Sequence, residues 1–97
     1  MEGINVVHNP ERKRFEVKID GRLAVCEYIM TSTRIIFTHT EVPKGLEGKG
    51  IGTALAKTAM EYARANSLKI MPLCPYIASY MRRHPEHQDM LVAGVKI

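Results

Sequence analysis

Three glycines at alternating positions are the strongest chemical signal in the sequence. Gly48, Gly50 and Gly52 lie between a segment rich in β-branched residues and a long amphipathic pattern that starts near Ile51. A glycine loop that opens a helix presents free backbone N–H groups, and the helix dipole favours an anion at that position. The spacing therefore predicts a phosphate-binding loop, although a plain tight turn would contain the same glycines.

Two common phosphate loops are excluded by this spacing. A Walker loop needs Gly-Lys followed by Ser or Thr, whereas Gly48-Lys49 is followed here by Gly50. The dinucleotide fingerprint needs glycines spaced G-x-G-x-x-G after a buried parallel strand. The glycines of this chain are spaced G-x-G-x-G and follow what reads as an antiparallel segment.

Cys74 is a candidate nucleophile because it directly precedes Pro75, where a helix is expected to begin. The N–H groups and dipole of a helix start stabilise a thiolate. The alternative is a small buried residue, which is common for cysteine. Cys26 is expected in the core. The spacing of the two cysteines fits neither a zinc site nor a redox pair, so we expect two reduced thiols.

Acid–base candidates lie on the strand before the loop. His39 and Glu41 have the same parity, so they share one face of a strand, and either could act as a general base. Tyr80 lies on the apolar stripe of the second helix, a position that favours packing. His84 and His87 have no convincing third ligand, so no metal site is expected.

The elements that position these residues follow from hydrophobic periodicity. Residues 14–19 alternate with period two, Asp20-Gly21 suits a type I′ turn, and residues 22–30 carry apolar side chains on both faces, which is typical of a central strand. The predicted fold is α/β of the α+β type, a mixed sheet in a single domain over residues 1–97, with an antiparallel meander followed by a β-α-β-α unit. The expected strands are 4–8, 14–19, 22–30, 34–42 and 68–71; helices start at Ile51 and Pro75 and stop at Asn66 and Pro85, and residues 91–97 form a last strand or a tail.

Composition limits the function classes. The chain has 97 residues and a formal net charge of +4, which suits either nucleic acid or a polyanionic cofactor. No apolar run reaches the ~20 residues of a membrane span, and the start of the sequence lacks secretory features. A cytoplasmic location is therefore expected.

The glycine segment resembles the acetyl-coenzyme A motif of the GNAT superfamily of N-acetyltransferases. That motif reads Gln or Arg, two residues, Gly, one residue, then Gly or Ala; Glu47 holds its first place, and Gly50 and Gly52 match its glycines. A minimal subfamily of about this length carries further matching segments. These are His39-Thr40-Glu41-Val42, Cys74-Pro75-Tyr76 and His84-Pro85.

The resemblance implies acetyl-coenzyme A as the cofactor. The coenzyme diphosphate would lie on the backbone amides of residues 49–53, and Lys49 would screen its charge. The pantetheine arm would pair with the strand edge at Glu41 and Val42, and Cys74 and Tyr80 would lie near the thioester. The resemblance also makes Tyr80 a candidate general acid that returns a proton to the leaving thiolate, with packing as the alternative. Glu47 is expected to point away from the phosphates. The implied cofactor-binding residues are Glu41, Val42, Gly48, Lys49, Gly50, Ile51, Gly52, Thr53, Cys74, Tyr80 and Arg83.

Three functions remain open at this level. The first is an N-acetyltransferase that acts on an unidentified amine, which could belong to a small molecule or to a protein. The second is a non-catalytic acyl-coenzyme A-binding module, because only Asn9-Pro10-Glu11 separates the first two strands and larger relatives place acceptor-site helices there. The third is a small nucleic-acid binder, which has little support because aromatic residues make up only 6% of the chain. A monomer or weak homodimer is expected.

Overall fold

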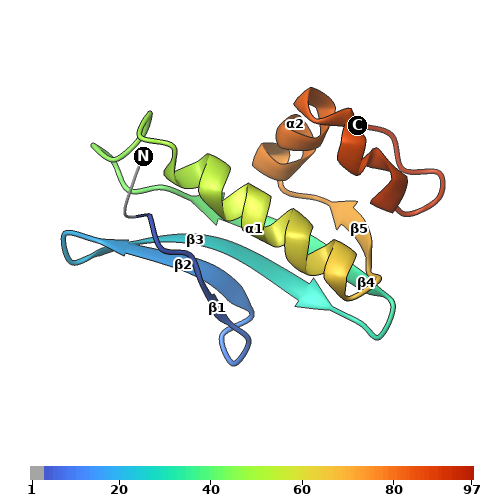
Figure 1. Cartoon of the computed structure of the whole chain (residues 1–97), viewed down its shortest axis with the longest axis horizontal. Helices are drawn as coiled ribbons and strands as arrows, with labels where there is room; N and C mark the ends of the chain where they lie inside the picture. The colour runs from blue at the N-terminus through green and yellow to red at the C-terminus, as the bar shows by residue number, and fades with distance from the viewer. Residues whose placement is uncertain (1–3) are drawn as a thin grey trace.

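The structure is a computed structural model that describes residues 4–97. A five-stranded sheet forms the base, and helices cover one of its faces (Figure 1). The elements are β1 (Val7–Asn9), β2 (Arg14–Ile19), β3 (Arg22–Met30), β4 (Arg34–Glu41), α1 (Ile51–Ala65), β5 (Lys69–Pro72), α2 (Pro75–Arg83) and the 3-10 helix η1 (Pro85–Met90).

The sheet has the strand order β1-β2-β3-β4-β5. The first four strands are antiparallel neighbours, and β5 returns parallel to β4 after α1. The β2–β3 hairpin turns at Asp20 and Gly21, whose φ angles of 53° and 74° are both positive, as a type I′ turn requires. The predicted mixed sheet, with a meander followed by a β-α-β-α unit, is confirmed.

Within residues 4–97, only one face of the sheet is covered, although residues 22–30 are apolar on both faces. β3 is central in the strand order, and its inward residues Ala24, Cys26 and Tyr28 are buried. On the other face, Ile29 pairs with Ile36 across the ladder and is 53% exposed. Both helices pack on the inward face, so the outer face of β3 stays open, while its central place in the strand order is as predicted.

Helix α1 crosses the inward face of the sheet, where its apolar stripe is buried (Figure 1). Leu55 and Ala59 of this stripe are fully buried, and small alanines allow the helix to approach the strands closely. The helix ends at Ala65, as Asn66 predicted. None of the helices formed by residues 4–97 has both the length and the apolar character needed to cross a membrane.

Element boundaries differ from expectation at both ends of the chain. The first strand begins at Val7 rather than at residue 4, whereas α2 ends at Arg83 with His84 as its C-cap, so Pro85 stops the helix as predicted. The short helix η1 was not predicted, because two turns of 3-10 helix carry no clear apolar period. Of residues 91–97, only Leu91 makes a bridge, to Ile70 of β5, so this segment is a tail rather than a strand.

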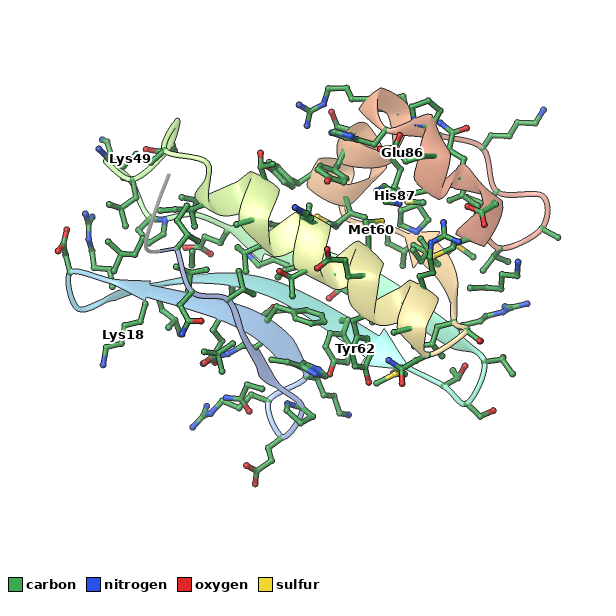
Figure 2. The ribbon with its side chains drawn as sticks, in the orientation of Figure 1. Lys18, Lys49, Met60, Tyr62, Glu86 and His87 are labelled. Atoms are coloured by element: carbon green, nitrogen blue, oxygen red, sulfur yellow. The ribbon has the colours of Figure 1, made fainter. Side chains whose placement is uncertain are left out.

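A cluster of aromatic rings fastens the short edge strand β1 to α1. The His8 ring stacks on Phe15 at 4.5 Å between centroids and meets the edge of Tyr62 at 4.5 Å. Its Nε2 atom lies 2.6 Å from the Tyr28 hydroxyl. Figure 2 shows Tyr62 on the side of α1 that faces these strands. Such contacts stabilise a strand too short to hold its place by ladder bonds alone.

The environment of His8 predicts a loss of stability in mild acid. Burial lowers the pKa of His8, so the folded chain binds this proton more weakly than the unfolded chain. The contribution of neutral His8 to the free energy of unfolding is complete above the ordinary histidine pKa of about 6.5. This contribution is lost as pH falls from there towards the lowered pKa of the folded state. Urea unfolding at about pH 7.5 and about pH 5.5 should show a smaller fall in the free energy of unfolding for His8→Gln than for wild type. An equal fall in both proteins would contradict this assignment.

Candidate functional site

The glycine loop between β4 and α1 adopts a conformation that few other residues accept. Gly45, Gly48 and Gly50 have φ angles of +91°, +78° and +82°. An L-residue with a side chain is strained in this region by roughly 1–2 kcal/mol. Leu46 is only 5% exposed and anchors the loop to the core, while Figure 2 shows Lys49 at its outer end. The loop is thus held in one place by its apolar residue and shaped by its glycines.

The start of α1 presents backbone N–H groups without partners. The first helical hydrogen bond runs from the Ala54 amide to the Gly50 carbonyl at 3.0 Å. Within residues 4–97, nothing accepts a hydrogen bond from the amides of Ile51, Gly52 or Thr53, and no side chain caps the helix. The Glu47 carboxylate accepts from the Gly45 amide at 2.7 Å, so it is bound back onto its own loop. This arrangement can receive an anion.

A cleft opens at this helix start. It lies between the end of β4, the glycine loop, the first turn of α1 and the first turn of α2. The residues that line it are Thr40, Val42, Leu46, Glu47, Gly48, Gly50, Ile51, Gly52, Thr53 and Tyr76.

The edge of β4 is unpaired where it meets the cleft. Parallel pairing with β5 covers residues 34–37 opposite residues 69–72, and β4 continues beyond this to Glu41. Residues 38–41 therefore have a strand neighbour only on the β3 side, as far as the described part of the chain extends. An unpaired edge of this kind can accept an extended ligand as an added strand.

Cys74 is the N-cap residue of α2, as predicted, but its thiol lies behind the cleft wall. Its amide donates to the Phe37 carbonyl at 2.8 Å, which ties the start of α2 to β4. Its side chain is not used as a cap and donates instead to the Thr40 hydroxyl at 3.2 Å. The residue is 2% exposed and is not part of the cleft lining, whereas Thr40 is.

The family model for GCN5-related N-acetyl-transferases matches residues 14–90, a stretch that includes the loop, the cleft and Cys74. The chain belongs to the GCN5-related N-acetyltransferase family. It is 35% identical to Protein NATD1 of Xenopus tropicalis, over 84% of this chain and 78% of that protein. With Protein NATD1 of Mus musculus it shares 36% identity, over 84% and 77%. The solution NMR structure of a GCN5-like protein from Staphylococcus aureus superimposes with a TM-score of 0.74 at 27% identity, covering 99% of this chain and 94% of that one.

Position 52 requires glycine for a different structural reason from positions 48 and 50 of the motif. A Cβ atom at this position would lie 2.4 Å from the Tyr76 hydroxyl and 2.8 Å from the ring carbon that bears it. Gly52 therefore makes room for a side chain of α2, a contact between two helices that no local pattern predicts. Both residues line the cleft, so this close approach is part of its wall.

Tyr80 is not brought to the cleft of this GCN5-related fold. It is 4% exposed, and its ring stacks on His84 at 4.1 Å between centroids. Burial raises the pKa of its hydroxyl. Arg83 lies at the far end of α2, about 12 Å along the helix from Pro75 at 1.5 Å per residue. The structure thus places both residues away from the glycine loop.

His39 and Glu41 lie together, as their parity predicted, but not at the cleft. The His39 Nε2 atom is 3.1 Å from the Glu41 carboxylate, and both side chains are more than half exposed. Side chains alternate along a strand, and Thr40 between them faces inward to Cys74. The pair consequently lies on the open face of the sheet.

A third cluster, of His84, His87 and Glu86, lies near η1. Figure 2 shows Glu86 and His87 at the opposite end of the molecule from Lys49. The Glu86 carboxylate is 3.5 Å from His84 and 3.9 Å from His87. No group of three or more His, Cys, Asp or Glu residues among residues 4–97 is arranged to hold a metal ion.

Thr40 and Tyr76 line the cleft but, like Leu46, were not among the predicted site residues. Both were quoted only as members of the segments His39-Thr40-Glu41-Val42 and Cys74-Pro75-Tyr76. The sequence does show where these two residues lie. Tyr76 falls in the first turn of the helix that Cys74 starts, and Thr40 must face the side of its strand opposite to His39 and Glu41. Neither position indicates contact with the glycine loop or with the thiol.

Cys26 provides a test of how the two thiols differ. Burial raises its pKa to about 12, with a hydrogen bond from Thr40 acting in the opposite direction. At about pH 8 almost no thiolate is present at such a pKa, so Cys26 should stay unmodified by iodoacetamide in the folded protein. Peptide mass spectrometry would detect modification, and denatured protein serves as the positive control. Rapid labelling of Cys26 in the folded protein would contradict its placement in the core.

Proposed function

We propose that this chain binds acetyl-coenzyme A in the cleft and transfers the acetyl group to an amine. The observation that carries the proposal is that an unpaired strand edge and an unbonded helix start open onto one cleft. The first suits the amide-bearing pantetheine arm, and the second suits a diphosphate. A coenzyme of this type needs both features at once.

The residues suggest how the coenzyme would be held. The amides at the start of α1 would donate to the diphosphate, and the positive φ angles of Gly48 and Gly50 aim the loop so that they are free. The backbone at Glu41 and Val42 would pair with the pantetheine arm. Lys49 would lower the cost of bringing phosphate charge to the loop, and the formal net charge of +4 acts in the same direction.

The coenzyme brings an activated acetyl thioester, and the chain must direct its reaction. Backbone N–H groups at the unpaired end of β4 could stabilise negative charge on a carbonyl oxygen. Cys74, one hydrogen bond behind the cleft wall, is the candidate for a covalent acyl carrier. The acceptor amine would approach from the open face of the sheet, where His39 and Glu41 lie, and either could take its proton.

Titration calorimetry with coenzyme A and acetyl-coenzyme A tests this function. We expect saturable binding of both at micromolar concentrations, and release of free thiol from acetyl-coenzyme A when a primary amine is supplied. Absence of binding would end the proposal. NADH serves as a control ligand, because it also carries a diphosphate but has no pantetheine arm.

A non-catalytic acyl-coenzyme A-binding module is the second candidate. One observation favours it: the turn of residues 10–13 joins β1 directly to β2, so the chain supplies no acceptor-site helices there. Tyr80, proposed as the general acid, is also buried away from the cleft. Tight binding without thiol release, across a panel of small amines and lysine peptides, would decide for this candidate.

Nucleic-acid binding has less structural support than either. It would need aromatic rings free to stack with bases. Phe15, Tyr28, Phe37 and Tyr80 are each at most 4% exposed.

A further inference from the structure

Thr40 connects the cleft to the buried thiol of Cys74. Thr40 lines the cleft, and its Oγ1 atom accepts the hydrogen bond from the Cys74 thiol at 3.2 Å. Thr40 is also the cross-strand partner of Cys26. Two cysteines and one cleft thus meet at a single residue.

The backbone fixes this meeting point. Thr40 is held by its pairing with Cys26 on β3, and the start of α2 is held to β4 by the bond from the Cys74 amide to the Phe37 carbonyl. The Cys74 side chain makes no capping hydrogen bond to α2. Its thiol proton therefore points to Thr40, and Thr40 alone joins it to the cleft by a hydrogen bond among the residues that the structure describes.

We infer that Thr40 is the positioning residue for Cys74: its hydroxyl holds the thiol proton on the cleft side and sets the rate at which the sulfur reacts with an electrophile that enters the cleft. The hydroxyl accepts from the thiol, and after deprotonation it can turn and donate to the thiolate. Both states of the sulfur are thus hydrogen bonded, which a methyl group in the same place could not achieve. That the natural electrophile is an acyl thioester rests on the proposed function; the role of Thr40 toward the sulfur does not.

Alkylation by iodoacetamide tests the inference without coenzyme. In this reaction the Cys74 sulfur forms a bond to the methylene carbon, iodide leaves, and the thiol proton passes by way of the Thr40 hydroxyl to water in the cleft. The rate is followed on the intact folded chain by peptide mass spectrometry at fixed pH. Thr40→Val removes the hydroxyl and keeps the shape, and Thr40→Ser keeps the hydroxyl and removes the methyl group.

We expect Thr40→Val to slow alkylation of Cys74 by about tenfold, which is the scale of one lost hydrogen bond to a charged sulfur. Thr40→Ser should restore the rate to near that of wild type. Thr38→Val is the matched control, because this threonine of β4 is exposed and its hydroxyl donates to the Glu27 carbonyl, away from Cys74. It should react as wild type does. Thermal melting verifies that each variant is folded, and Thr40→Ala replaces the valine variant if that protein is not.

Three results would overturn the inference: an unchanged rate in Thr40→Val, a serine variant as slow as the valine variant, or an equal loss in Thr38→Val. The proposed function fails separately, if wild type does not bind coenzyme A. Should the coenzyme bind and an acetyl group be found on Cys74, the rate at which that adduct forms is expected to show the same order of variants.

Discussion

Gly50→Val is expected to weaken binding of coenzyme A by about ten- to a hundredfold, because each lost hydrogen bond to a charged group costs about 1.5–3 kcal/mol. Gly50 has a φ angle of +82° directly before the first residue of α1. A β-branched residue is a steric outlier there, so the loop must rotate and the amides of the first turn lose their common direction. Titration calorimetry with coenzyme A measures the affinity.

The hairpin glycine provides a matched control for backbone strain. Gly21 has a φ angle of +74°, and its hairpin between β2 and β3 contributes nothing to the cleft lining. Backbone strain should therefore lower the free energy of unfolding of Gly21→Val by about as much as that of Gly50→Val. The affinity of Gly21→Val for coenzyme A should stay within about twofold of wild type. Equal losses of affinity in the two variants would mean that the loop has no particular part in binding.

Local chemistry made the main elements of the fold predictable. Alternation in residues 14–19, the positive φ angles needed at Asp20-Gly21 and the position of Pro75 at a helix start each follow from steric rules within a few residues. The structure confirms all three. The open outer face of the sheet was not predictable in this way. Whether Ile29 is covered depends on which face the helices occupy, and no local pattern determines that.

The candidate site was only partly predictable, for the same reason. The glycine loop and the N-cap position of Cys74 are local features, and the structure places them as expected. The contact between Gly52 and Tyr76 joins two helices, and the contact between Thr40 and Cys74 joins a strand to a helix. Such contacts depend on how the elements pack, so no role in them could be assigned to these residues from the sequence. Tyr80 was assigned from the resemblance, and packing against His84 buries it.

Gly52→Ala is expected to lower coenzyme affinity by about tenfold while changing stability little. The new methyl group would occupy the space of the Tyr76 hydroxyl, 2.4 Å away, and the far end of a half-buried tyrosine can give way more easily than backbone. The ring should therefore swing into the cleft that both residues line. Alanine gains up to about 1 kcal/mol in helix propensity over glycine, which offsets the lost packing. Coenzyme A titration and urea unfolding measure the two effects.

The double variant Gly52→Ala with Tyr76→Ala separates this steric explanation from a direct one. If the tyrosine ring is what blocks the cleft, removing it should recover most of the affinity that Gly52→Ala loses, and the two substitutions should be strongly non-additive. If the amide of residue 52 must instead approach the diphosphate closely, the alanine methyl group obstructs the ligand itself, and the loss persists without Tyr76. A persistent loss would return Gly52 to the role that its place in the glycine motif first suggested, and Tyr76 would then be a wall of the cleft that leaves the loop unaffected.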